Sequence, residues 1–203
     1  MESHATVYVL DDDWRILDSL KALLSSVGFS VECFPDSSSF FNAADLNAPS
    51  CLILDINLGA ATGFDVLQQM NASRSAISVV VLSGTEDIRS AVKSMKLGAI
   101  EFLSKPIDTQ ELLLAVNTAL NRAAKRRERL DAMHCVNERY SRLTPRERDV
   151  LPYVVRGFLN KQTAYELGRS EITIRIHRGN IMRKMQSASL PDLVRQAFQL
   201  GIA

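Results

Sequence analysis

The sequence has few cysteines, few aromatic residues and no long apolar run. Its 203 residues include three cysteines, and aromatic residues make up 6% of the chain. An odd number of widely separated cysteines, without a paired Cys/His spacing, argues against a disulfide framework and a zinc site. No apolar run approaches the roughly 20 residues that a membrane span requires. The N-terminus lacks the basic and apolar regions of a signal peptide, so we expect a cytoplasmic protein without a membrane partner.

Charge is distributed unevenly along the chain, although the net charge is only +1. Residues 1–122 contain 8 Lys+Arg and 15 Asp+Glu, a net charge of −7, whereas residues 123–203 contain 16 and 8, a net charge of +8. Such an asymmetry predicts two domains, and the basic one is a candidate for binding a polyanion. A merely solvated basic surface is the alternative that charge alone leaves open.

Short apolar runs alternate with amphipathic segments in the first part of the chain. We predict five strands, each followed by a helix, over residues 6–10, 30–34, 51–54, 77–82 and 99–103. This alternation is typical of a parallel sheet that is covered by helices on both faces. We therefore predict a doubly wound α/β domain with a five-stranded parallel sheet over residues 1–122.

The helical spacing that begins near Asp108 continues beyond this domain, so we predict a helical linker over residues 123–140. A short coiled-coil contact along the linker and a solvated charged segment are both compatible with its pattern. The helical spacing of residues 141–203 predicts a small all-α domain. There a short helix capped by Asn160 is followed by a glycine and by a longer, arginine-rich helix over residues 171–185. This order is typical of a helix-turn-helix.

Charged side chains follow three of the predicted strands. Asp11-Asp12 follow the first strand, Asp55 the third, and Lys105-Pro106 the fifth. Because ligands of open α/β sheets bind beyond the carboxyl ends of the strands, we expect these groups to converge. Crowded carboxylates repel one another unless a divalent cation lies among them, and Mg²⁺ takes oxygen ligands. The pattern predicts a pocket that binds Mg²⁺ (or Mn²⁺) and accepts a phosphoryl group on an aspartate.

With Ser83 after the fourth strand, these motifs resemble the receiver domain of bacterial two-component response regulators. The resemblance implies a flavodoxin-like fold with Asp55 as the phosphoacceptor and Lys105 as its catalytic partner. It implies a switch made of Ser83 and Phe102, and a cis peptide bond before Pro106. The implied metal ligands are Asp11, Asp12, Asp55 and the backbone carbonyl of Asn57.

Two features of this region need a separate interpretation. Where the family usually has a Met-Pro or similar pair, the chain has Leu58-Gly59, and we expect Gly59 to make the loop more flexible. Asp13 lengthens the acidic run to three residues. We interpret it as the cap of the first helix rather than as a metal ligand.

Residues 141–203 resemble the LuxR-type helix-turn-helix domain, notably in Leu143-Thr144-Pro145-Arg146-Glu147-Arg148 and Thr173-Ile174-Arg175-Ile176-His177-Arg178. The whole chain is thus similar to the nitrogen-fixation-type (FixJ/NarL-like) response regulators. In the predicted recognition helix, Ile174, Ile181 and Met185 form an apolar stripe toward the core. We predict base contacts by Arg175 and Ile176, and phosphate contacts by Lys161, His177, Arg178, Arg183 and Lys184.

We therefore expect a DNA-binding response regulator, without enzymatic activity beyond slow self-dephosphorylation. A sensor histidine kinase would phosphorylate Asp55, and phosphorylation would promote a homodimer on double-stranded DNA, with RNA polymerase as a further candidate partner. The last helix, with Leu193, Val194, Ala197 and Leu200, offers a second dimer contact, packing within its own domain, or both. One alternative is a Mg²⁺-dependent phosphohydrolase with an unrelated basic tail. Another is a DNA-binding protein whose receiver has lost phosphate control.

Overall fold

The structure is a computed structural model that describes residues 6–59, 61–73, 75–84 and 87–202. The chain divides into two compact units, residues 1–128 and 129–203. The 33-residue helix α5, Thr109–Ser141, has residues in both units, and residues 123–140 lie within it. Among the described residues, none of the helices combines the length and the apolar character that crossing a bilayer requires.

Five parallel strands form the sheet of the first unit. Their order across the sheet is β2-β1-β3-β6-β7, which is the flavodoxin-like arrangement. The strands are β1 (Thr6–Leu10), β2 (Ser30–Phe34), β3 (Cys51–Asp55), β6 (Ser78–Ser83) and β7 (Glu101–Ser104). The predicted doubly wound parallel sheet is confirmed.

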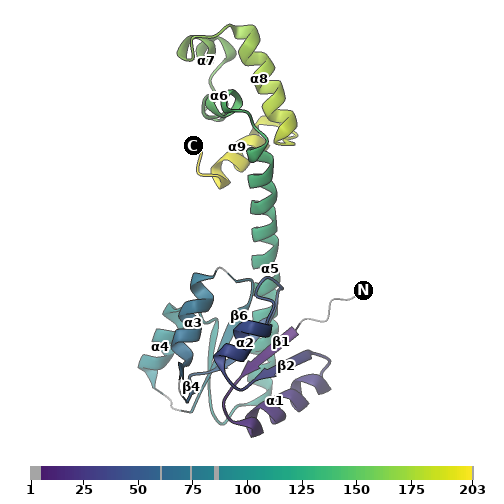
Figure 1. Cartoon of the computed structure of the whole chain (residues 1–203), viewed down its shortest axis with the longest axis vertical. Helices are drawn as coiled ribbons and strands as arrows, with labels where there is room; N and C mark the ends of the chain where they lie inside the picture. The colour runs from purple at the N-terminus through teal and green to yellow at the C-terminus, as the bar shows by residue number, and fades with distance from the viewer. Residues whose placement is uncertain (1–5, 60, 74, 85–86, 203) are drawn as a thin grey trace. The chain divides into compact units, whose positions relative to one another are not determined.

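Helices cover both faces of this sheet, as Figure 1 shows. On one face α1 (Trp14–Ser26) and α5 pack their leucines against Val7, Val9 and Ile53. On the other face lie α2 (Ser37–Ala43), α3 (Gly63–Ala72) and the end of α4 (Ile88–Lys96). Every residue of β3 is buried, because side chains on both faces of this central strand meet a helical layer.

A small antiparallel pair, β4 (Asn57–Leu58) and β5 (Ala61–Thr62), follows β3 and was not predicted. Gly59 lies in the turn between the two strands with a φ of 60°. This left-handed conformation favours glycine. The backbone at position 59 therefore accounts for a glycine here, and the expected flexibility of the loop stays a prediction.

The second unit contains four further helices around a small core. They are α6 (Pro145–Val155), α7 (Asn160–Glu166), α8 (Glu171–Lys184) and α9 (Leu190–Gln199). Ile174, Ile181 and Met185 are fully buried, so the predicted apolar stripe of α8 faces this core.

The helix starts in this unit follow local capping chemistry. Thr144 caps α6 in a capping box, because its backbone N–H donates to Glu147 Oε2 at 2.8 Å and its hydroxyl accepts from the Glu147 N–H. The expectation that Asn160 caps α7 is wrong. Leu159 occupies the cap position, and its backbone N–H donates to Gln162 Oε1 at 2.8 Å. A glutamine from inside the helix thus satisfies a backbone group before the helix.

Candidate functional sites: an acidic pocket and an exposed helix

The predicted catalytic and metal-binding residues lie at the carboxyl ends of the parallel strands. Asp11 follows β1, Asp55 ends β3, Ser83 ends β6, and Lys105 follows β7. Asp11, Asp55 and Ser83 are almost fully buried, while Asp12 is exposed. Since parallel strands end at a common edge of the sheet, residues almost 100 positions apart in sequence share one pocket.

Lys105 connects two of these carboxylates. Its Nζ lies 3.0 Å from Asp55 Oδ2 and 2.8 Å from Asp11 Oδ2. The contact with Asp55 fits the predicted pairing, but the contact with Asp11 was not foreseen. The Lys105–Pro106 peptide bond is cis, as the family resemblance implied. Lys105 thereby offsets part of the negative charge that two buried carboxylates bring to the site.

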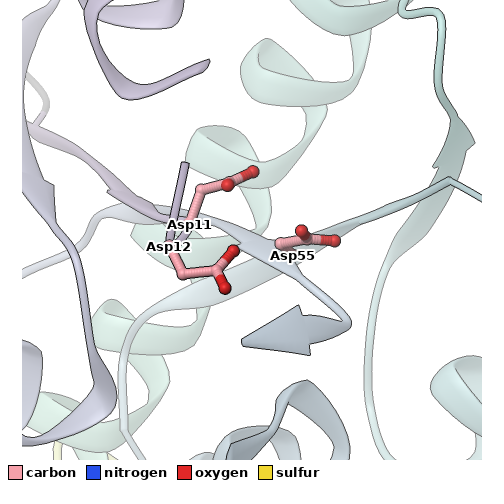
Figure 2. A group of neighbouring side chains, drawn as sticks. All are labelled: Asp11, Asp12 and Asp55. Carbon is pink, nitrogen blue, oxygen red and sulfur yellow. The ribbon is translucent and has the colours of Figure 1, made fainter. Parts of the chain in front are cut away.

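The three aspartates fit a divalent cation. One carboxylate oxygen each from Asp11, Asp12 and Asp55 lies within 4.8 Å of the others. Figure 2 shows the carboxylates of Asp11 and Asp12 extending toward the side on which Asp55 lies. Asp55 Oδ1 is buried and has no hydrogen-bond partner among the described residues. A buried carboxylate oxygen without a donor is suited to a cation, and an all-oxygen set suits Mg²⁺.

Burial and charge shift the pKa values of the pocket. Burial raises the pKa of Asp55, and the nearby Asp11 carboxylate raises it further. The Lys105 ammonium acts to lower this pKa but does not outweigh burial. Burial acts to lower the pKa of Lys105, but hydrogen bonds to Asp11 and Asp55 outweigh it, so this pKa lies above its ordinary value. Hydrogen bonds from Arg15 lower the pKa of Asp13 to about 2. Asp13 also caps α1 by accepting from the Arg15 N–H at 3.0 Å, as predicted.

Two glycines that follow Asp55 in the chain shape the pocket: Gly59 in the loop and Gly63 at the start of α3, of which Gly63 was not predicted. A Cβ added to Gly63 would collide with the carbonyl oxygen of Asp55 and lie 2.8 Å from Ile56 Cα. A Cβ added to Gly59 would lie 3.2 Å from Asp12 Oδ2. The signal for Gly63 was its place at the start of an amphipathic helix, eight residues after Asp55, but glycine at a helix start has several explanations. Asn57 lines the same pocket.

The predicted switch residues lie on the neighbouring strands β6 and β7. Ser83 is buried at the end of β6, and it faces Ser104 of β7 in the strand register. Phe102 pairs with Val81 and is half-buried against the core on the α3 face of the sheet. Ser83 thus lies at the carboxyl end of its strand, and Phe102 lies two residues before the end of β7.

The predicted DNA contacts on the second unit fall into two groups. The first group is exposed and consists of Lys161, Arg175, Ile176 and Arg183. Within α8, Arg183 Nη2 donates to Asn180 Oδ1 at 3.3 Å. His177, Arg178 and Lys184 are half-buried. Arg178 Nη1 donates to the Phe158 carbonyl at 2.9 Å, and Lys184 Nζ lies 2.7 Å from Glu147 Oε2. Two of the seven side chains therefore hold α8 to other parts of its own unit.

Helix α9 packs part of its apolar face within the second unit. Leu193 and Ala197 are fully buried in the core of the second unit. These two residues serve internal packing, whereas Val194 and Leu200 are half-buried, so a second dimer contact through this helix stays a prediction. The sequence pattern left both roles open because an amphipathic helix looks the same whether its apolar face meets its own domain or a partner.

Comparisons with known proteins match the two units of the chain to two domain families. Residues 7–117 match the response regulator receiver domain, and residues 141–197 match the bacterial regulatory proteins of the luxR family. The response regulator protein TodT of Pseudomonas putida is 44% identical over 97% of this chain and 86% of its own length. The transcriptional regulatory protein FixJ of Azorhizobium caulinodans is 38% identical over 100% of this chain and 96% of its own length.

Solved structures give the same result. The response regulator StyR matches with a TM-score of 0.83 and 38% identity, covering 97% of this chain and 100% of StyR. Full-length FixJ from B. japonicum matches with a TM-score of 0.58 and 35% identity, covering 98% of each chain. The comparisons give no support to the phosphohydrolase alternative. The chain belongs to the response regulators that combine a receiver domain with a LuxR-type DNA-binding domain.

Proposed function

We propose that Asp55 accepts a phosphoryl group and that this event controls DNA binding by the second unit. The observation that carries the proposal is the convergence of Asp11, Asp12 and Asp55 within 4.8 Å, with Lys105 Nζ 3.0 Å from Asp55. A carboxylate oxygen of Asp55 forms the new bond to phosphorus while the bond from phosphorus to the donor breaks. Lys105 then stabilises the negative phosphoryl oxygens.

Asp11, Asp12, Asp55 and the backbone carbonyl of Asn57 are the residues that would hold Mg²⁺ or Mn²⁺ in this pocket. When bound, the cation would neutralise charge on the incoming phosphoryl oxygens. The Ser83 hydroxyl would donate a hydrogen bond to a phosphoryl oxygen, and Phe102 would turn inward behind it. Beyond slow self-dephosphorylation of the phosphoaspartate, we propose no enzymatic activity.

The phosphate donor is a sensor histidine kinase, because a receiver domain implies such a partner. We place its contact beside the pocket, where α1 and the start of α5 form a groove of about 450 Å³. Lys105 borders this groove, and its walls are mainly apolar: Ile16, Leu20, Leu23, Ile107 and Leu112. A kinase seated there would hold its phosphohistidine next to Asp55.

In the second unit, we propose that α8 enters the major groove of double-stranded DNA. Arg175 and Ile176 would reach base edges, and Lys161 and Arg183 would contact phosphates. Phosphorylation would promote a homodimer that reads two half-sites, and RNA polymerase is a further candidate partner. A regulator of this kind acts where the bacterial chromosome is, so we propose a cytoplasmic location.

The test is DNA binding and sedimentation of wild type and Asp55→Asn, each with and without acetyl phosphate and Mg²⁺. Wild type should dimerise and bind DNA more tightly when the phosphate donor is present, and Asp55→Asn should not respond. Asp13→Asn is the matched control, because Asp13 pairs with Arg15 and should respond like wild type. Equal responses of wild type and Asp55→Asn would remove Asp55 from the mechanism.

A further inference from the structure

We propose that the exposed face of α8 recognises thymine methyl groups through Ile172 and Ile176, and that Gly179 lets this face approach DNA closely. The inference rests on the proposed DNA-binding function and extends it to the class of sequence that is read. It adds two residues, Ile172 and Gly179, to those that the sequence pattern singled out as base contacts.

The three residues lie on one face of the helix. Positions 172, 176, 179 and 183 are separated by four, three and four residues, the spacing of a single helical face. Ile174 and Ile181 are fully buried on the opposite face. Ile172 is 64% exposed and Ile176 is 57% exposed, so neither side chain contributes much to the core of its own unit.

The charge of the second unit indicates which kind of partner binds the exposed face of α8. Residues 129–203 contain 13 Lys+Arg and 7 Asp+Glu, a net charge of +6, which favours a polyanion. Arg175 is exposed on the turn between Ile172 and Ile176. In a helix-turn-helix the second helix lies in the major groove, where the C5-methyl of thymine is the apolar group among the base edges. The two exposed isoleucines therefore suit contacts with thymine methyl groups, and the arginine beside them suits a neighbouring guanine.

Gly179 has no explanation within the unit itself. Its φ is not in the left-handed region, and an added Cβ would have nothing within 4 Å. Neither the backbone nor internal packing requires a glycine here, although glycine is the weakest helix former after proline. Its position in the middle of the exposed face assigns the requirement to a ligand outside the chain. Glycine permits the close approach of a backbone to such a ligand.

The first experiment uses atomic substitution in the DNA. Binding sites are selected from random-sequence duplexes with the full chain, acetyl phosphate and Mg²⁺, and each thymine of a selected site is then replaced by uracil. We expect at least one replacement per half-site to weaken wild-type binding about fourfold, the factor for one buried methyl group. Ile172→Ala or Ile176→Ala should abolish this sensitivity, whereas Ile172→Val should retain it.

The possible outcomes separate this inference from the proposed function. Enrichment of a sequence without any effect of uracil would overturn the recognition of thymine methyls and leave DNA binding intact. Failure to enrich any sequence would overturn both.

The second experiment uses Gly179→Ala, for which two effects of opposite sign are expected. The thermal midpoint of the second unit should rise, because alanine favours the helix. Affinity for the selected duplex should fall about tenfold or more, because the added methyl group meets the DNA. The rise in stability excludes misfolding as the cause of weaker binding. Unchanged or tighter DNA binding by Gly179→Ala would overturn the close approach.

Discussion

Gly63 lies directly against the main chain of Asp55, so that a side chain at position 63 would collide with the Asp55 carbonyl oxygen. The Gly63 N–H also donates to the Ile56 carbonyl at 2.8 Å. We predict that Gly63→Ala lowers the free energy of unfolding of the receiver unit by about 1–3 kcal/mol, the usual cost of overpacking. Urea unfolding followed by circular dichroism measures this change.

Gly84→Ala is the control for this prediction. Gly84 is exposed, and a Cβ there would have nothing within 4 Å. The free energy of unfolding should therefore change by no more than about 0.5 kcal/mol. If Gly63→Ala were as stable as Gly84→Ala, the close packing of Gly63 against the Asp55 backbone would be refuted.

Trp14 is the only tryptophan of the chain, and it lies beside the acidic pocket. It borders a surface depression together with Asp12, Asp13 and Arg15. We predict that Mg²⁺ changes the tryptophan fluorescence in a saturable manner, since cation binding alters the charge next to the indole. Asp12→Asn should abolish the change, whereas Asp13→Asn should preserve it. A titration in which Asp12→Asn keeps the saturable signal would count against Asp12 as a metal ligand.

The acidic pocket could be predicted from sequence because parallel strands impose a simple geometry. Asp11, Asp55 and Lys105 each stand at a strand end, so the order of strands brings them together without knowledge of any loop. The β4–β5 pair and the role of Gly63 could not be predicted in the same way. Two-residue strands carry no periodic signal, and the packing of Gly63 appears only once the start of α3 is placed against the Asp55 main chain.

Glu147 and Lys184 form an ion pair between α6 and α8, and this pair predicts a pH dependence. Burial acts to raise the pKa of Glu147, but hydrogen bonds from Lys184 and Thr144 outweigh it, so this pKa lies below its ordinary value. A carboxyl group whose pKa is lower in the folded state stabilises the fold above its unfolded pKa of about 4.3. That stabilisation is lost as the pH falls through the folded pKa.

The measurement is urea unfolding of wild type and Glu147→Gln, followed for the second unit, from pH 7 to below about 4. At pH 7 the variant should be less stable by about 2 kcal/mol, since hydrogen bonds to a charged group are lost. The difference should shrink as the pH falls below about 4, because wild type then loses the same charge. A difference that is independent of pH would show that the Glu147 charge does not stabilise the fold.

Lys161 and Lys184 should differ in their effect on the salt dependence of DNA binding. Lys161 is exposed on α7, whereas the Lys184 ammonium is 2.7 Å from Glu147. We predict that Lys161→Ala reduces the slope of log K against log salt by about 1, the value for one lost phosphate contact. Lys184→Ala should leave the slope unchanged. Equal slopes for the two variants would contradict this division of roles.

The role of Lys184 shows why the DNA contacts were harder to predict than the pocket. A basic residue near the end of an arginine-rich helix has the same sequence pattern whether it contacts a phosphate or a buried glutamate. Its partner Glu147 is 37 residues away, and no periodicity links the two positions. The buried stripe of Ile174, Ile181 and Met185 was predictable, because one helical face repeats with the period of the helix.

The central claim is that Asp55 alone among the clustered aspartates accepts the phosphoryl group. The most direct test is mass spectrometry of wild type, Asp12→Asn and Asp55→Asn after incubation with acetyl phosphate and Mg²⁺, with peptide mapping of the modified residue. We predict one phosphoryl group on the wild-type peptide that contains Asp55, little on Asp12→Asn, and none on Asp55→Asn. A phosphoryl group on Asp11 or Asp12, or equal phosphorylation of Asp55→Asn, would contradict the account.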